Sequence, residues 1–498
     1  MTEAPPDRSA SRALLGRGSI YTLATAVQLA GAVLVIPALT RVLPKDELGI
    51  ATVGVVITAT IGLLLAAGLP GAITREYFQG PEGERNVGAM VTLSAGLSVL
   101  LGGVAFALGP LWAGPLHGFR PAFMVATATA ITYSVIVTGQ AVQRARNQPG
   151  RFVLVVALNV VGGQLLGILL VLTVSRTAVA YLAGIAVASV AGAVLSLVWC
   201  RPSIRGLGDR VALKRWFAIA LPTVPHMAAL YLMTAGDRYI VLHGLNEGGA
   251  AEYNVSYQVG ALGITLVAAA NNAWAPLIYG APEKTRWQTL AITTADMLRV
   301  AAIVAAGLAM AAPLGLWLAA PSGKYDVGAL TPVVALTALA TVPYVLYLAS
   351  AHVLFQRGRT VALIWISPLA VLASLAVKAV VLPRFGLAGI ALVTAVAYGL
   401  LATLVGWERR KLATVPWHRR WPEFVGAAVL CVAGALIPLT WVGAAARVVI
   451  TIALLALLAR TGKHLLADRK SATAEATAAQ PPATPSPAPS AGPSPEAR

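Results

Sequence analysis

Charged side chains inside apolar stretches are the residues of this chain best suited to bind or couple an ion. Asp237 and Arg238 interrupt an apolar run that continues from Tyr239 to Leu242. Charges at such positions are costly in a bilayer, so they usually face a cavity or pair with another group. Arg238 is therefore a candidate for holding an anion in a cavity, with Asp237 tuning it or taking a cation. The alternative is a local ion pair at the membrane interface.

Three further arginines are candidates for the same anion site. Arg41 ends the first apolar stretch, and the planar guanidinium of arginine can contact two phosphate oxygens at once. Arg17 and Arg75 lie at other helix ends. A simpler role stays open for all three, because basic residues at helix ends extend into the polar interface or fix the orientation of the chain.

Other polar residues in apolar stretches are candidates for ion coupling or for lining a polar cavity. His226 lies beside Pro222 and Pro225, which free backbone carbonyls and favour a kink. The other candidates are Lys378, Asn271 and Asn272. Each also has a structural explanation, since histidine and asparagine form hydrogen bonds between helices and a lysine near a helix end reaches water.

Sequence patterns of common enzymes are missing. The chain has no G-x-x-x-x-G-K-[ST], H-E-x-x-H or G-x-S-x-G. Its six histidines lack the spacing of metal ligands, and Cys200 and Cys431 are too few for a zinc site made of cysteines. We therefore expect no catalytic residue, no metal and no cofactor, and hence a protein that is not an enzyme.

Composition places these residues in a membrane protein. The chain has 498 residues, of which 58% are hydrophobic and 11% charged, with a mean hydropathy of +0.77. So few charges would not cover the surface of a soluble protein of this size. Spanning a bilayer takes about 20 mostly apolar residues. Fourteen stretches qualify as helices: 18–40, 50–73, 87–111, 121–142, 152–174, 178–199, 216–241, 253–275, 296–318, 327–355, 360–382, 386–406, 423–443 and 445–466.

The net charge of +18 is explained by orientation. Loops that retain lysine and arginine stay in the cytoplasm. With the N-terminus inside, the inner segments hold more than twenty lysines and arginines, whereas the outer turns hold eight. We therefore expect cytoplasmic N- and C-termini, contact with membrane lipid, and no nucleic acid partner.

The first twelve stretches form a repeat of six. Three pairs of matches fall on equivalent helices: Gln143–Arg146 with Gln356–Arg359, Leu182–Ala186 with Leu387–Ala391, and Arg41 with Arg238. Because six is even, the two units have the same orientation, which is a parallel repeat around an axis along the membrane normal. Two such units facing each other create a central cavity suited to alternating access.

The fold class expected is an all-α polytopic membrane protein with two six-helix lobes and two additional C-terminal helices. The segments expected are a cytoplasmic start (1–17), a first lobe (18–199), a basic connector (200–215), a second lobe (216–406), a basic loop (407–422), helices 13 and 14 (423–466) and a disordered tail rich in Pro, Ala and Ser (467–498).

Short motifs give the chain a resemblance to a known family. Arg41-Val-Leu-Pro-Lys-Asp-Glu-Leu-Gly49 looks like the signature that opens polysaccharide exporters. Asp237-Arg238 followed by Gly249-Ala-Ala-Glu-Tyr253 looks like the second-half signature of the same family, and Lys324-Tyr325 is similar to its later pattern. Over about residues 10–465 the chain thus resembles the multidrug/oligosaccharidyl-lipid/polysaccharide exporter superfamily, in its polysaccharide (O-antigen type) flippase branch.

The resemblance implies a function and a location. Members of this branch flip oligosaccharides linked to polyprenyl pyrophosphate from the inner to the outer leaflet of the bacterial cytoplasmic membrane. The pyrophosphate would then bind Arg41 and Arg238, the glycan would lie in the cavity, and the polyprenyl chain in lipid. Partners would be the lipid-linked oligosaccharide and a polysaccharide polymerase or glycosyltransferases.

Two alternatives stay open at this point. A lipid II flippase is similar in having fourteen helices and cavity arginines. A membrane glycosyltransferase or polymerase that uses polyprenyl-linked sugars commonly keeps an acidic residue in an outer loop, and Asp46 and Glu47 lie in the first one. The short outer loops and the repeat favour a transporter over such an enzyme.

Overall fold

The computed structural model describes residues 35–78, 82–359, 361–418 and 421–478. These residues form helices joined by short loops, and the described part contains no strand. Most of the first expected span, 18–40, and Arg17 lie outside the described residues, although 35–42 are helical. The expected tail lies partly outside them as well.

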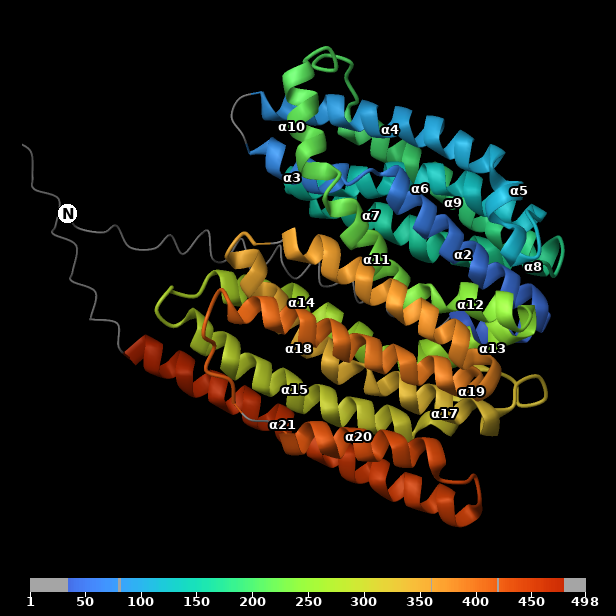
Figure 1. Cartoon of the computed structure of the whole chain (residues 1–498), viewed down its shortest axis with the longest axis vertical. Coiled ribbons are helices and arrows are strands. Elements are labelled where there is room, and N and C mark those ends of the chain that lie inside the picture. The colour runs from blue at the N-terminus through green and yellow to red at the C-terminus, as the bar shows by residue number, and fades with distance from the viewer. Residues whose placement is uncertain (1–34, 79–81, 360, 419–420, 479–498) are drawn as a thin grey trace, which may run out of the picture.

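The first half of the chain forms a bundle of long helices (Figure 1). Its elements are α2 (Lys45–Leu65), α3 (Leu69–Tyr77), α4 (Gly83–Ala107), α5 (Gly109–Trp112), η1 (Gly114–Leu116), α6 (Pro121–Ala145), α7 (Pro149–Val156), the π-helical turn η2 (Ala157–Gly162), α8 (Gly163–Thr173) and α9 (Ala178–Cys200). Local signals set several starts: Pro121 and Pro149 begin α6 and α7, where the missing N–H costs nothing. The Thr177 hydroxyl caps α9.

The second half forms a neighbouring bundle. After α10 (Arg210–Ala220), which packs on the first half, its elements are α11 (Thr223–Ala235), α12 (Asp237–Gly244), α13 (Glu247–Gly260), α14 (Leu262–Tyr279), α15 (Arg286–Met310), α16 (Ala312–Ala319), α17 (Val327–Leu339), α18 (Thr341–Gln356), α19 (Val361–Arg410), α20 (Trp421–Leu436) and α21 (Trp441–Ala478). The expected kink is present, since α10 ends at Ala220 and α11 begins at Thr223. Side chains of Asp209, Asn246 and Asp326 cap α10, α13 and α17.

Eleven helical segments of the described chain are long and apolar enough to cross a membrane. The α19 segment has 50 residues and a backbone break at Gly386, where φ is 59°, so it has the length of two spans. The 16-residue α20 is shorter than the other spans. The all-α polytopic fold is thus confirmed, while the count of fourteen stays a prediction.

The boundary between the halves that we expected from the sequence differs from the boundary that the packing shows. We expected the second lobe to begin at 216, yet Trp216 and Ala220 of α10 are buried in one cluster with Leu69 and Met90 of the first half. The basic connector therefore continues into a helix that is anchored on the first half, and the chain passes to the second half at the kink before α11.

The loops gather at two ends of the molecule (Figure 1). One end, called the closed end below, carries the loops 43–44, 113–120, 174–177, 245–246, 320–326 and 437–440. The other, called the basic end, carries 146–148, 201–209, 280–285, 357–359 and 411–418. The arginine-rich loops of the sequence pattern thus share one end.

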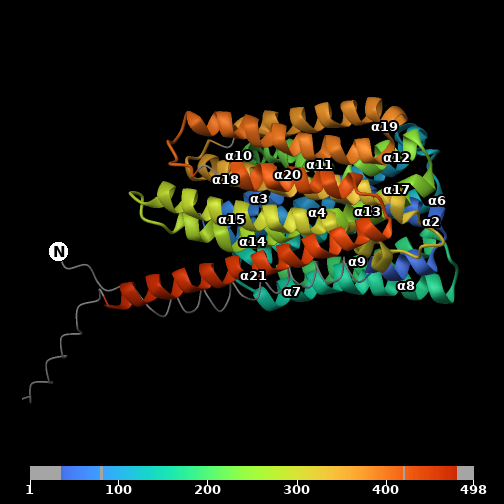
Figure 2. The ribbon, with the colours of Figure 1, turned by 90° about the horizontal axis from the view of Figure 1, so that it is seen from below.

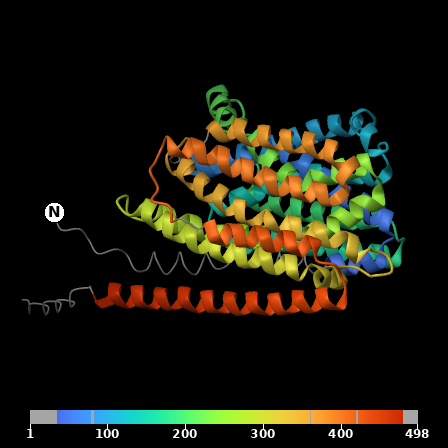
Figure 3. The same ribbon diagram turned by 60° about the horizontal axis from the view of Figure 1, so that its bottom comes forward.

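Helices α20 and α21 lie at one edge of the second half (Figure 1) and are in front when the molecule is seen from that edge (Figure 2). Helix α20 packs on α15 and α17, α21 packs on α15, and α21 runs along the outside of the bundle (Figure 3). The buried Arg447 of α21 joins them to the core, because its Nη atoms donate to carbonyls that end two other helices: Ala309 and Met310 of α15 at 3.4 Å, and Gly434 and Ile437 of α20 and its end at 2.8 Å.

Candidate functional site

Asp237 is the centre of a buried polar cluster in the second half. Its carboxylate is fully buried and accepts hydrogen bonds from the Lys378 ammonium of α19 and the Tyr253 hydroxyl of α13. The Thr394 hydroxyl, from the other part of α19, donates to Asp237 Oδ2 at 3.0 Å. Lys378 is 1% exposed, so it does not reach water as a lysine near a helix end can. Three helices thus meet on one carboxylate.

Arg238, the next residue, has different partners. Its Nη1 donates to the Thr234 carbonyl at 2.5 Å, and its Nη2 and Nε donate to Asn254 Oδ1 at 3.2 and 3.4 Å. The guanidinium lies 4.3 Å from the centre of the Tyr257 ring, within the range of a cation–π contact. Arg238 is 4% exposed, and its charge has no carboxylate partner among the salt bridges of the described chain. Asp237 and Arg238 therefore do not pair with each other.

Arg41 lies at the closed end and is exposed. Its Nη1 donates to the Pro37 carbonyl at 2.7 Å, and both Nη atoms reach the Leu318 carbonyl of α16 at 3.3–3.4 Å. Arg41 stands four residues before the start of α2, whereas Arg238 stands nine before the start of α13. The equivalence drawn from the repeat thus places Arg238 about a helical turn deeper, and the two arginines share no partner.

The remaining candidates are spread over the molecule. His226 is buried between α11 and α19, with Nδ1 2.9 Å from the Ser367 hydroxyl. Asn271 contacts His352 of α18 at 3.0 Å, while Asn272 is exposed. Arg75 is exposed in the last turn of α3, at the basic end. The structure therefore brings together Asp237, Arg238 and Lys378 and leaves the others apart.

The sequence analysis missed a set of polar contacts that join the two halves at the closed end. Lys45 of α2 pairs with Glu252 of α13 at 2.5 Å. Glu247, at the start of α13, contacts Arg120 Nη1 at 3.0 Å and His117 Nδ1 at 3.2 Å. These charges lie in loops or near the starts of helices. The sequence offers no sign that they pair, because charges at such places are ordinarily explained by the orientation of the chain in the membrane.

Backbone carbonyls complete this closure. Lys324 Nζ donates to the Leu43 and Thr40 carbonyls at 2.7 and 3.1 Å. The Thr40 hydroxyl donates to the Ala319 carbonyl at 2.7 Å, and His243 Nδ1 donates to the Pro115 carbonyl at 2.8 Å. Among the described residues, one further polar contact between the bundles, from the Tyr239 hydroxyl to Thr60 at 3.4 Å, lies in the last third of α2.

Gly49 marks the closest approach of the halves. A Cβ built on it would lie 1.8 Å from the Glu247 carbonyl oxygen, so α2 and α13 meet there backbone against backbone. Helices α2 and α13 are the expected second and eighth spans, which are equivalents in the repeat. The close contact thus explains why the first signature ends in glycine, since a side chain at this position would not fit.

The contacts between the halves at the closed end should weaken in acid, because Glu247 takes part in them as an ionised carboxylate. The Glu247 N–H at the start of α13 lowers the pKa of this carboxyl most, burial opposes it, and His117 and Arg120 lower the pKa further. At a pH above 4.5, the ordinary pKa of this carboxyl, the ionised Glu247 stabilises the closed arrangement. This contribution is lost as the pH falls through the lowered pKa.

We expect spin labels at the exposed Ser175 and Ser322, one on each half at the closed end, to move apart as the pH is lowered below 4.5. Electron–electron distance measurements in detergent would follow this change. In Glu247→Gln the distance should no longer respond to pH. An identical response in Glu247→Gln and the parent would contradict the assignment.

The fold and these geometries define a class of protein: a multi-pass helical membrane protein with the fold of a two-bundle transporter. The chain belongs to the polysaccharide biosynthesis protein family, whose model matches residues 15–280. The family resemblance drawn from the signatures at Arg41 and Asp237 is therefore confirmed. The chain has no significant match among curated proteins.

Solved structures share the fold. An inward-facing multidrug resistance MATE family transporter of the MOP superfamily has a TM-score of 0.64 at 15% identity, over 78% of this chain and 97% of that one. The lipid II flippase MurJ in an inward closed conformation has a TM-score of 0.64 at 11% identity, over 91% and 99%. An outward-facing MATE transporter scores 0.57 at 16% identity, over 79% and 94%.

Proposed function

We propose that the protein flips oligosaccharides linked to polyprenyl pyrophosphate from the inner to the outer leaflet of the bacterial cytoplasmic membrane. It works by alternating access, with the basic end in the cytoplasm, and it supplies a polysaccharide polymerase or glycosyltransferases on the outer side. Family membership supports the link to polysaccharide synthesis. The arginine-rich loops at one end support the orientation.

One structural observation carries the transport mechanism: within the described residues, and with α10 counted with the first half on which it packs, the polar contacts between the halves, apart from Tyr239 to Thr60, lie at the closed end. Closing one end of a two-bundle transporter leaves the other available for loading. The better match to the inward-facing than to the outward-facing MATE structure supports the same state. A substrate entering from the basic end then approaches Arg238, a buried cation for which the described part of the chain offers no carboxylate partner.

The pyrophosphate binds Arg238 in this proposal, with Arg41 as a second contact on the outward path. Asn254 and the Thr234 carbonyl hold the Arg238 guanidinium through hydrogen bonds, and phosphate oxygens replace these acceptors when substrate arrives. Asp237 does not compete, because Lys378, Tyr253 and Thr394 occupy it. Arg17, Arg75, His226, Asn271 and Asn272 remain candidates for contacts with the pyrophosphate or glycan at earlier steps.

Proteoliposomes with a fluorescent polyprenyl-pyrophosphate oligosaccharide test this function. Arg238→Ala should lower the initial flipping rate at least about tenfold, because a hydrogen bond to a charged group contributes about 1.5–3 kcal/mol. Arg41→Ala should have a smaller effect. Arg176→Ala is the matched control, since Arg176 is an exposed arginine of the closed end and takes no part in the proposed site.

Flipping that is equal in Arg238→Ala and Arg176→Ala would remove Arg238 from the mechanism. A folded parent protein that transfers no lipid, with or without an ion gradient, would contradict the flippase itself. The same sample would then be assayed for new glycosidic bonds, with Asp46 and Glu47 as the next residues to change.

Lipid II is the second candidate substrate. The MurJ match extends over 91% of this chain, against 78% for the inward-facing MATE transporter. MurJ is a lipid II flippase, and lipid II is also a saccharide on a polyprenyl pyrophosphate. Competition between unlabelled lipid II and the labelled oligosaccharide in the same assay decides between them.

A further inference from the structure

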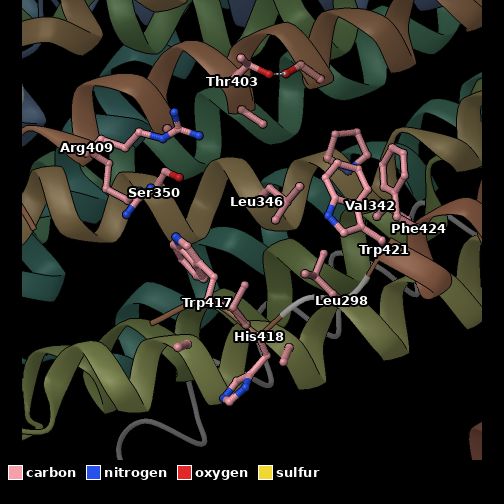
Figure 4. Close-up of a pocket in the computed structure, with 18 of the residues that line it drawn as sticks. Leu298, Val342, Leu346, Ser350, Thr403, Arg409, Trp417, His418, Trp421 and Phe424 are labelled. Atoms are coloured by element: carbon pink, nitrogen blue, oxygen red, sulfur yellow. Dashed lines mark hydrogen bonds between the residues drawn. The ribbon is translucent and has the colours of Figure 1, made fainter. Parts of the chain in front are cut away.

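A second cavity lies in the second half, away from Asp237 and Arg238. It has a volume of about 730 Å³ and opens near the basic end between α15, α18, the last turns of α19 and the start of α20. Figure 4 shows Leu298, Val342, Leu346 and Phe424 facing one another across it. Apart from a few polar side chains the wall is apolar, so a ligand that fills the cavity must have an apolar portion.

Arg409 is the unusual member of this wall. Its side chain is 7% exposed, its Nη1 has only a long contact of 3.4 Å with the Ala413 carbonyl, and its Nε has no acceptor among the described residues. The guanidinium lies 5.1 Å from the Trp417 ring. Described carboxylates do not neutralise it, since Glu408 pairs with Lys411 at 2.6 Å and Glu423 lies 3.8 Å from Arg299.

Arg447 shows how this chain treats a buried arginine that needs no ligand. Its Nη atoms reach four backbone carbonyls, although its Nε, like that of Arg409, has no acceptor among the described residues. The Nη atoms of Arg409 have one weak carbonyl contact within the described part of the chain, although a buried charge without a partner is costly. A guanidinium left open toward a cavity therefore indicates an anionic ligand.

The rim of the cavity has the composition of a membrane interface. Arg410 is a second cation, exposed where Arg409 is buried, and Trp407, Trp417 and Trp421 also line the cavity. Tryptophan concentrates at the level of lipid headgroups. The side chains of Trp407, Thr403 and Trp421 are exposed, which suits an opening at the level of the lipid headgroups.

We propose that this cavity binds one anionic phospholipid from the leaflet at the basic end. The phosphate contacts Arg409 and Arg410, and an acyl chain lies between Leu298, Leu346 and Phe424. A free anion would leave the apolar wall empty, whereas a phospholipid satisfies the cation and the wall together. The bound lipid would join α20 to α19, which gives the two C-terminal helices a fixed place against the transporting half.

Native mass spectrometry of the delipidated full chain tests the site with palmitoyl-oleoyl phosphatidylglycerol and phosphatidylcholine as probes. We expect one tight phosphatidylglycerol, bound at least about tenfold more tightly than phosphatidylcholine. Arg409→Gln should weaken this first binding step about tenfold, since it removes a charge-assisted contact. Arg359→Gln is the control, because Arg359 is an exposed arginine of the basic end outside the cavity and should change affinity less than about twofold.

A second variant tests the cavity independently of charge. Ala295 lines it and is buried, so Ala295→Phe fills the space and should abolish the same binding step while keeping both arginines. A further readout is the thermal midpoint, which phosphatidylglycerol should raise in the parent and in Arg359→Gln only.

Three outcomes would overturn the proposal. The first is unchanged phosphatidylglycerol affinity in both Arg409→Gln and Ala295→Phe, and the second is equal affinity for the two phospholipids. The third is displacement of phosphatidylglycerol by an equimolar polyprenyl phosphate, which would assign the cavity to the transported lipid instead.

Discussion

Replacing Gly49 with valine is expected to open the closed end. The Cβ of any larger residue would meet the Glu247 carbonyl oxygen at 1.8 Å, and this oxygen belongs to the backbone of α13, so it cannot turn aside. Overpacking of this kind costs about 1–3 kcal/mol. That cost applies to the closed arrangement alone, so the population shifts toward a state in which α2 and α13 separate.

Distances between spin labels measure the shift. Labels at Ser175 and Ser322 should move apart, and labels at the exposed Phe78 and Lys284 of the basic end should approach each other. The initial flipping rate should fall, because the variant returns more slowly to the loading state. Gly96→Val is the matched control, since a Cβ at Gly96 of α4 has no neighbour within 4 Å. Unchanged distance distributions in Gly49→Val would show that the contact does not hold the halves together.

Removing either charge of the buried pair between Asp237 and Lys378 is expected to cost more stability than any other single change in the polar cluster. In Asp237→Asn the ammonium of Lys378, 1% exposed, keeps its charge but loses its counter-ion. Breaking a buried ion pair on one side costs about 3–5 kcal/mol. Lys378→Met should be similarly harmful, because it leaves the carboxylate with hydroxyl donors only.

The double variant Asp237→Asn with Lys378→Met distinguishes a pair from two independent losses. Removing both charges avoids the unpaired state, so its thermal midpoint in detergent should lie above that of either single variant. Lys411→Met is the control for a broken but exposed pair, and should cost about 0–1 kcal/mol. Single variants as stable as the parent, or a double variant with simply added losses, would contradict the ion pair.

The sequence predicted the all-α, multi-pass character of the chain, because a helix in lipid must be apolar along its whole length. Breaks within spans were harder to foresee. The prolines announced the kink before α11, but nothing in Ala157–Gly162 signals the π-helical turn there. The position of α10 on the first half also depends on Trp216 packing, which hydropathy does not report.

Three of the candidate residues lie together in the structure, but their pairing differs from the one that the sequence suggested. Asp237, Arg238 and Lys378 each stood out as charges within apolar stretches. The sequence suggested Arg238 as the neighbour of Asp237, yet the ion pair forms with a lysine 141 residues away. Adjacent residues on a helix point in different directions, so the partner of each depends on which helices pack around it. Arg41 was matched to Arg238 through the repeat, but a few residues of offset place one at the surface and the other inside.

Arg447 has a consequence for how the protein is made. Its acceptors belong to α15 and to the end of α20, up to 138 residues earlier in the chain. Since a guanidinium in lipid is costly until it finds such groups, α21 can settle only after those helices stand in place. Biogenesis in the membrane should therefore end with the docking of α21, and a chain that lacks α15 or α20 should leave its last helix poorly inserted.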